Sequence, residues 1–186
     1  MLFVDDYHLH ATKGVRRRFH RLRKHAGNPV QVFSDPWGSA CNNHGGFEVD
    51  PGSGDVVLWY STGPSDAEGV ADKRFVCQAR STDGIHWEVP SLGLHEFRGS
   101  RDNNICLMAW GPVVKDTEEQ NPARRYKMIV KGPPRERGIR AGYSADGIHW
   151  SEETRIDLSE WEGGMPDIVA LVIDDQDPDP SRRFKL

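Results

Sequence analysis

The chain has 186 residues, and its 28 acidic residues outnumber its 24 lysines and arginines, which leaves a net charge of −4. This mildly acidic balance is not typical of nucleic-acid-binding proteins, and no stretch approaches the ~18 apolar residues of a transmembrane helix. Residues 1–4 are followed at once by Asp5 and Asp6, so we predict no signal peptide and favour the cytoplasm. We therefore expect a globular protein that binds neither nucleic acid nor a membrane.

Residues 1–36 precede the first predicted structural unit. Leu2, Phe3 and Val4 have the composition of a strand, which could pair with the last unit of a closed ring. Residues 16–24 form a basic run with interleaved apolar residues. We interpret this run as a solvated connecting segment, with a nucleic-acid-binding arm as the alternative.

One short phrase occurs twice: residues 81–87 read STDGIHW and residues 144–150 read SADGIHW. Each copy follows a strand-like run, at residues 75–80 and 139–143, and so predicts an antiparallel hairpin. The Asp-Gly pair predicts a two-residue type I′ turn, because Asp tolerates a positive φ and Gly adopts it freely. Trp87 and Trp150, which end the two copies, are expected to pack between neighbouring units.

The repeat extends beyond these hairpins. Two further strands precede each copy, at residues 46–50 and 56–60 and at residues 112–116 and 126–130. Residues 116–128 match residues 174–186 at a constant offset, with identical residues at the pairs Pro122/Pro180, Arg124/Arg182, Arg125/Arg183 and Lys127/Lys185. Four strands in about 60 residues, repeated in tandem, are typical of the blades of a β-propeller.

The predicted fold is therefore all-β, with no helix of useful length. Residues 37–95 form the first predicted blade, residues 96–157 the second, and residues 158–186 the start of a third. Propellers typically close with four to eight blades, so about two and a half blades suggest the N-terminal part of a longer protein.

Three polar stretches fall where the innermost strand of each predicted blade begins, at residues 34–38, 100–104 and 163–167. They carry Asp35, Asp102 and Asp167, about one blade apart. Ligand sites on such scaffolds lie in a central pocket, so we expect these three carboxylates to converge there. Carboxylates that share one pocket repel each other, which raises their pKa values and helps to keep one of them protonated.

Residues 3–6 (FVDD), 102–105 (DNNI) and 83–87 (DGIHW) resemble segments of the five-bladed propeller glycosidases of families 32, 43 and 68. The likeness is closest to bacterial proteins similar to the family 32 N-terminal domain, and it spans nearly the whole chain. The resemblance implies a five-bladed propeller that cleaves a glycosidic bond of a carbohydrate substrate. It implies no cofactor, although an axial Ca²⁺ occurs in some propeller glycosidases.

The resemblance also implies roles for individual residues. Asp35 in SDPWG is similar to the nucleophile of the family 32 motif N-D-P-N-G, and Asp102 after Arg101 is similar to the aspartate of R-D-P, which stabilises the transition state. The family's catalytic acid lies in a Glu-Cys pair that this chain lacks. Glu160, Glu162 or Asp167 is left for that role.

Other residues near these acids are candidates for binding substrate. Trp37 and Trp110 can stack on a sugar ring. The side chains that can hydrogen-bond a polyol are those of Asn43, His44, Arg101 and Asn103. Each candidate also has a structural alternative: a turn before Pro36 for Asp35, a loop cap for Asp102, and a core position for the tryptophans. The three cysteines show no metal-binding spacing and are expected to be free and buried.

Two alternative functions remain open on the sequence alone. A propeller that kept its blades and lost the catalytic acid would be a carbohydrate-binding or interaction module. A sialidase-like enzyme is the third hypothesis, because its Asp-box S-x-D-x-G-x-x-W is similar to STDGIHW. In this chain Gly follows Asp directly, and no arginine triad marks the strand starts.

Overall fold

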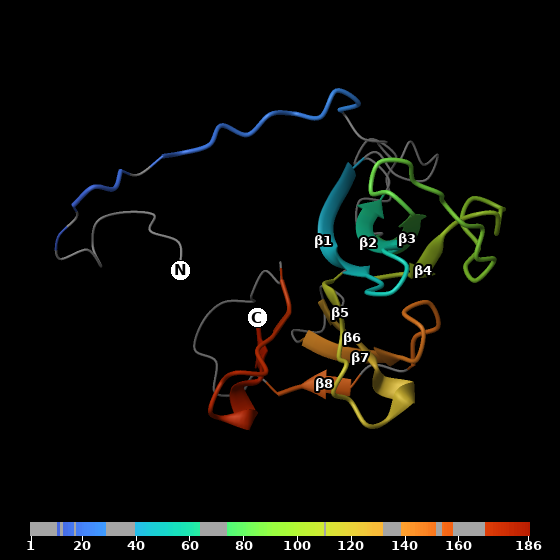
Figure 1. Ribbon diagram of the computed structural model, residues 1–186. Coiled ribbons are helices and arrows are strands. Elements are labelled where there is room, and N and C mark those ends of the chain that lie inside the picture. Colours follow the sequence, from blue (N-terminus) through green and yellow to red (C-terminus); the bar gives the residue numbers. More distant parts are fainter. Residues whose placement is uncertain are drawn as a thin grey trace.

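The computed structural model describes residues 11, 13–16, 18–28, 40–63, 74–109, 111–131, 139–151, 154–157 and 170–186. Within them the chain is all-β, with two four-stranded antiparallel sheets and one hairpin (Figure 1). The first sheet contains β1 (Ala40–Val49), β2 (Val56–Gly63), β3 (Phe75–Ser81) and β4 (Ile105–Leu107); the second contains β5 (Val113–Lys115), β6 (Tyr126–Lys131), β7 (Ile139–Ser144) and β8 (Thr154–Ile156); the hairpin is β9 (Val172–Ile173) with β10 (Phe184–Lys185). The only helical turns in this part of the chain are the 3₁₀ turns Pro122–Arg124 and Pro180–Arg182.

Runs of β-branched and aromatic residues form the central strands of both sheets, as such residues fit a pleated, half-buried surface. β2 pairs with β3 from Val56 opposite Ser81 to Thr62 opposite Phe75, and β6 pairs with β7 from Tyr126 to Lys131. The strands predicted at these positions, and the all-β class, are confirmed. Closure of the sheets into a ring stays a prediction.

Two glycines in β1 allow its backbone to lie very close to the backbones of β2 and β5. The register between β1 and β2 shifts between Asn42 and Gly46, which marks a bulge. A Cβ at Gly45 would lie 2.0 Å from the carbonyl oxygen of Trp59, and a Cβ at Gly46 would lie 2.4 Å from that of Val113 in β5. β1 and β5, the first strands of the two sheets, therefore lie directly beside each other.

The two sheets pack through one shared core. It consists of Trp59, Val76 and Cys106 from the first sheet and of Val113, Met128 and Val130 from the second. Trp59 extends furthest across: its indole N–H donates to the carbonyl oxygen of Gly147 at 2.8 Å, and its ring lies 5.6 Å from that of Tyr126. Trp150 packs against this core as predicted.

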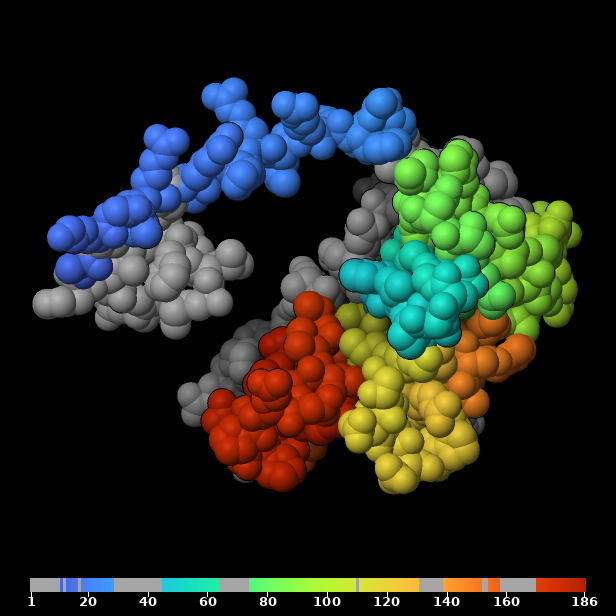
Figure 2. All heavy atoms as spheres, viewed as in Figure 1, coloured from blue at the N-terminus to red at the C-terminus, as the bar shows by residue number. Residues whose placement is uncertain are grey.

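The opposite faces of the two sheets are covered differently. On the second sheet, Ile129 and Ile139 pack with Leu171, which precedes β9, and the hairpin lies against this sheet in Figure 2. On the first sheet, Phe97 and Trp87 cover a cluster that includes Tyr60, Phe75, Cys77, Ala79 and Ile105. Each sheet thus has two apolar faces, as expected for units packed side by side.

Both copies of DGIHW form the same turn, but the type I′ prediction is wrong. Gly84 and Gly147 have positive φ values of 72° and 74°, whereas the aspartates before them do not. The Ser81 hydroxyl accepts hydrogen bonds from two backbone N–H groups, and the Asp83 carboxylate accepts two more. These side-chain bonds stabilise a wider turn, closed by the bridge between Arg80 and Glu88, in place of the two-residue one.

The N-terminal part shows no strand or helix among its described residues. All of those between residues 11 and 28 are exposed, including the described residues of the basic run, and they extend away from the sheets in Figure 2. The strand predicted at residues 2–4 lies outside the described residues. No helix in the described part of the chain is long and apolar enough to cross a membrane.

The core placement of two cysteines predicts unreactive thiols. Cys77 and Cys106 are buried thiols that form no disulfide, and burial raises the pKa of Cys106 to about 12. In a Cys41→Ser variant we expect neither remaining thiol to react with a disulfide reagent at pH 8 until the protein is unfolded, because the thiolate is the nucleophile. Rapid labelling of the native variant, at the rate of the urea-unfolded one, would contradict this placement.

Candidate functional site

The described part of the predicted pocket is the loop of residues 100–104, which leads into β4. Asp35, Trp37, Trp110, Glu162 and Asp167 lie outside the described residues, as does Glu160. Asn43 and His44 lie in β1, but their side chains are not described. The geometry of the site is therefore built on Arg101, Asp102 and Asn103.

A tight turn places this loop. Phe97 and Ser100 exchange two backbone hydrogen bonds of 2.9 and 3.1 Å across Arg98 and Gly99, whose φ values are 52° and 79°. Two consecutive positive φ values define the type I′ hairpin, so this geometry occurs at Arg-Gly and not at the Asp-Gly pairs. The Arg98 guanidinium lies 5.3 Å from the Phe97 ring centre, which provides a cation–π contact at the turn.

Arg101 and Asp102 are exposed at the end of this turn. The Asp102 N–H donates to the Ser100 hydroxyl at 3.0 Å, and the Arg101 guanidinium makes a long contact of 3.5 Å to the carbonyl oxygen of Gly93. Among the described residues no group donates to the Asp102 carboxylate. The backbone of Asp102 is therefore fixed, while its carboxylate faces solvent and is free to bind.

Asn103 anchors the loop to the protein. Its side-chain N–H groups donate to the carbonyl oxygens of His95 and Ser100, at 2.8 and 3.2 Å, and its side-chain oxygen accepts the N–H of Ile105. With both N–H groups used, the buried amide keeps one acceptor lone pair. Its observed role is structural, and the predicted contact to substrate stays a prediction.

Asn104 is a polar core residue that the sequence analysis missed. It is fully buried, and its side-chain N–H groups donate to the Tyr60 hydroxyl at 2.7 Å and to the Gln78 carbonyl oxygen at 2.8 Å. Its side-chain oxygen is buried without a hydrogen-bond partner among the described residues. The only signal in the sequence was a second Asn directly before a strand.

The loop lies at one edge of the first sheet. The strand order is β1, β2, β3, β4, so two strands separate the loop before β4 from β1 (Figure 1). The sequence analysis expected Asp102 where the innermost strand of a second blade begins. The structure instead pairs Ile105 and Leu107 with β3 of the first sheet.

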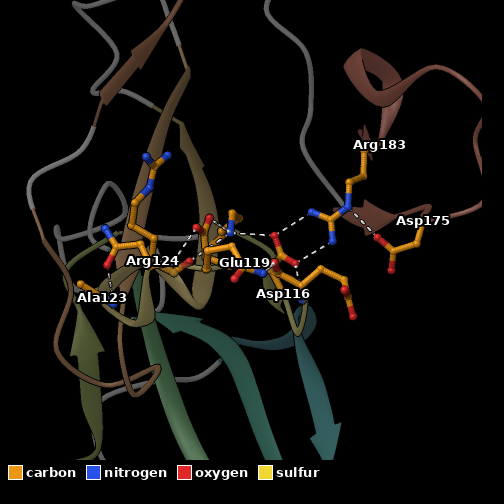
Figure 3. Close-up of polar contacts among 10 residues, drawn as sticks. Asp116, Glu119, Ala123, Arg124, Asp175 and Arg183 are labelled. Carbon is orange, nitrogen blue, oxygen red and sulfur yellow. Dashed lines mark hydrogen bonds and ion pairs between the residues drawn. The ribbon is translucent and has the colours of Figure 1, made fainter.

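The most strongly charged cluster of the described residues lies elsewhere, around Asp116 (Figure 3). The Asp116 carboxylate accepts both Arg183 N–H groups, at 2.6 and 2.7 Å, and the Lys127 ammonium at 2.8 Å. Lys127 also donates to Glu119 at 2.9 Å. Hydrogen bonds from Arg183 are the main reason that the pKa of Asp116 is well below its usual value.

This cluster is a structural clamp between units. Asp116 directly follows β5 and Lys127 lies in β6 of the second sheet, whereas Arg183 directly precedes β10 of the hairpin. A bidentate carboxylate–guanidinium pair is both strong and directional, and here every charge has a partner. No group in the cluster is left to act as an acid or a base.

A different polar contact joins the first two sheets. Glu48 of β1 accepts hydrogen bonds from the ammonium of Lys115 and from the hydroxyl of Tyr126, the latter at 2.8 Å. The hydrogen bond to Glu48 raises the pKa of Lys115, and burial raises that of Tyr126. Both contacts hold the two sheets together.

No three His, Cys, Asp or Glu residues in the described ranges gather closely enough to hold a metal ion. No family model matches the chain, and no curated protein or solved structure matches it.

Proposed function

We propose that the sheets are blades of a β-propeller and that the protein cleaves glycosidic bonds with carboxylates in the propeller's central pocket. The observation that carries the fold is the pair of neighbouring first strands, β1 and β5, at which two four-stranded units meet. In a propeller the first strands of successive blades surround the axis in this way. The activity rests on the similarity of Asp35 and of Arg101-Asp102 to glycosidase motifs.

The chemistry needs two carboxyl groups on opposite sides of the scissile bond. In this proposal ionised Asp35 attacks the sugar or activates water, and a protonated Glu162 or Asp167 donates to the leaving oxygen. The resemblance gives Asp102 the task of stabilising the positive charge that develops on the ring, which requires its loop at the β4 edge of the first sheet to reach the pocket. The exposed carboxylate of Asp102, on a loop fixed by the amide of Asn103, suits a group that contacts a ligand.

The second candidate is a non-catalytic carbohydrate-binding propeller. The position of Asp102 favours it, because the loop before β4 lies at the edge of the first sheet away from β1. An aspartate there can accept hydrogen bonds from sugar hydroxyls without meeting a carboxylate near β1.

Two aspartate variants distinguish these functions. In the glycosidase, Asp35→Asn and Asp102→Asn should each lower the rate of sugar release across a glycan panel at least about a hundredfold, with folding intact by circular dichroism. Asp55→Asn is the matched control, because Asp55 is exposed in the turn before β2 and contributes to none of the proposed chemistry. Its activity should equal that of the wild type.

The outcomes separate clearly. Full activity of both variants would refute the assigned site. A wild-type protein that binds glycans in a titration but hydrolyses none would establish the second candidate. Loss of activity in Asp35→Asn alone would place Asp102 outside the catalytic pocket.

A further inference from the structure

The β9–β10 hairpin repeats, residue by residue, the part of the second sheet that binds the hairpin itself. The backbone N–H of Asp116 donates to the Arg125 carbonyl oxygen at 2.8 Å, and that of Asp174 donates to the Arg183 carbonyl oxygen at the same distance. Lys127 bridges Asp116 and Glu119, and Lys185 bridges Asp174 and Asp177 in the same way. A 3₁₀ turn begins with Pro in both.

The two copies differ in what covers them. The Asp116 side chain is 2% exposed, because the Arg183 guanidinium lies on it. The Asp174 side chain is 40% exposed, and none of the described residues places a guanidinium on it. Val114 packs with Leu171 in a buried cluster, whereas Val172, its counterpart in β9, is 53% exposed.

The lysine distinguishes the surface that accepts an arginine, at Asp116, from the equivalent surface of the first sheet, which accepts none among the described residues. In the first sheet Val57 stands where Lys127 stands in the second, because Val57 pairs with Glu48 of β1 as Lys127 pairs with Val114 of β5. No ion pair joins Asp50 to Arg125, although both residues are described. The arginine clamp therefore accompanies the Asp–Lys pair, and the β9–β10 hairpin has that pair.

We infer that the β9–β10 hairpin is a docking surface for a further unit of the same repeat within the same polypeptide, one that presents an apolar residue to Val172 and an arginine to Asp174. Both interfaces seen here join consecutive units of one chain, which is why we assign the partner in cis. The inference depends on the repeat and not on the proposed glycosidase activity.

The experiment appends a copy of residues 129–186 to Leu186, which continues the repeat in register because Leu186 corresponds to Met128. A control carries Gln in place of the appended copy of Arg183. With the arginine present, the proton affinity of Asp174, followed by carboxyl NMR, should fall at least about tenfold relative to the control. The urea midpoint of the arginine version should also be higher, and Asp174→Asn should remove that difference.

Equal titration of Asp174 and equal midpoints in the two versions would overturn the inference. An Asp174 signal that depends on the concentration of the unextended chain would also overturn it, since the occupant would then be a second copy. Where the appended unit does not fold, a peptide of residues 170–186 and its Arg183→Gln form are each joined to Leu186 by a flexible linker instead, so that the peptide still acts in cis. A shift of the Asp174 signal with the first peptide alone supports the docking surface, and no shift refutes it.

Discussion

Gly147→Ala is expected to destabilise the protein by about 2–5 kcal/mol, whereas Gly84→Ala, at the same position of the first DGIHW copy, should cost only about 1–2 kcal/mol. Both glycines have a positive φ, and forcing alanine into that backbone conformation accounts for the cost of about 1–2 kcal/mol expected in either turn. At Gly84 an added Cβ meets nothing within 4 Å, but at Gly147 it would lie 2.5 Å from Cζ2 of Trp59. The extra cost is that of overpacking the contact between the sheets.

Urea unfolding followed by circular dichroism measures both values. Trp59→Phe supplies a further control, since the smaller ring vacates the space that the new methyl group needs. The combined Trp59→Phe/Gly147→Ala variant should therefore be more stable than the sum of the single changes predicts. Equal costs at Gly84 and Gly147, or strict additivity, would show that the turn of the second sheet does not rest on Trp59.

The repeat in the sequence predicted more of the fold than any single residue did. The runs at residues 56–60, 75–80, 126–130 and 139–143 became β2, β3, β6 and β7, because a strand with two apolar faces depends mainly on local composition. The predicted turn type is wrong at Asp83 because the hydrogen bonds that the Ser81 hydroxyl and the Asp83 carboxylate accept from backbone N–H groups outweigh the backbone preference of Asp-Gly. The sequence pattern does not show whether the side-chain hydrogen bonds or the backbone preference of Asp-Gly contributes more to the free energy of the turn.

The ion-pair partners of charged residues also could not be predicted from the sequence pattern. Arg125 and Arg183 occupy equivalent positions of the repeat, yet only Arg183 forms a clamp. The difference lies in the neighbouring unit, which offers Asp116 with Lys127 in one case and Asp50 with Val57 in the other. In the candidate site, the binding role of Asp102 stays a prediction, whereas the anchoring role of Asn103 depends on its hydrogen bond to the backbone of His95, which composition does not reveal.

Asp116→Asn should be the most destabilising single charge change, at about 2–3 kcal/mol, because it leaves Arg183 and Lys127 partly buried without their carboxylate. Asp174→Asn removes the equivalent carboxylate where it is 40% exposed and screened by solvent, so we expect a clearly smaller loss than at Asp116. The pair is matched in sequence context and in its lysine partner. Equal losses in urea unfolding would show that the Arg183 contact contributes nothing to stability.

The same carboxylate predicts a pH dependence with a definite sign. Hydrogen bonds from Arg183, followed by those from Lys127, hold the pKa of Asp116 below its value of about 3.9 in the unfolded chain. The unfolded chain therefore takes up the proton first as the pH falls, so the contribution of Asp116 is complete above about pH 4 and is lost progressively below it. Other aspartates with lowered pKa values, among them Asp83 and Asp174, add to the acid sensitivity of the wild type. The quantity to measure is therefore the difference in unfolding free energy between the wild type and Asp116→Asn. This difference should shrink from pH 5 to pH 2. A difference that stays constant over this range would mean that Arg183 does not hold Asp116 in its ionised form.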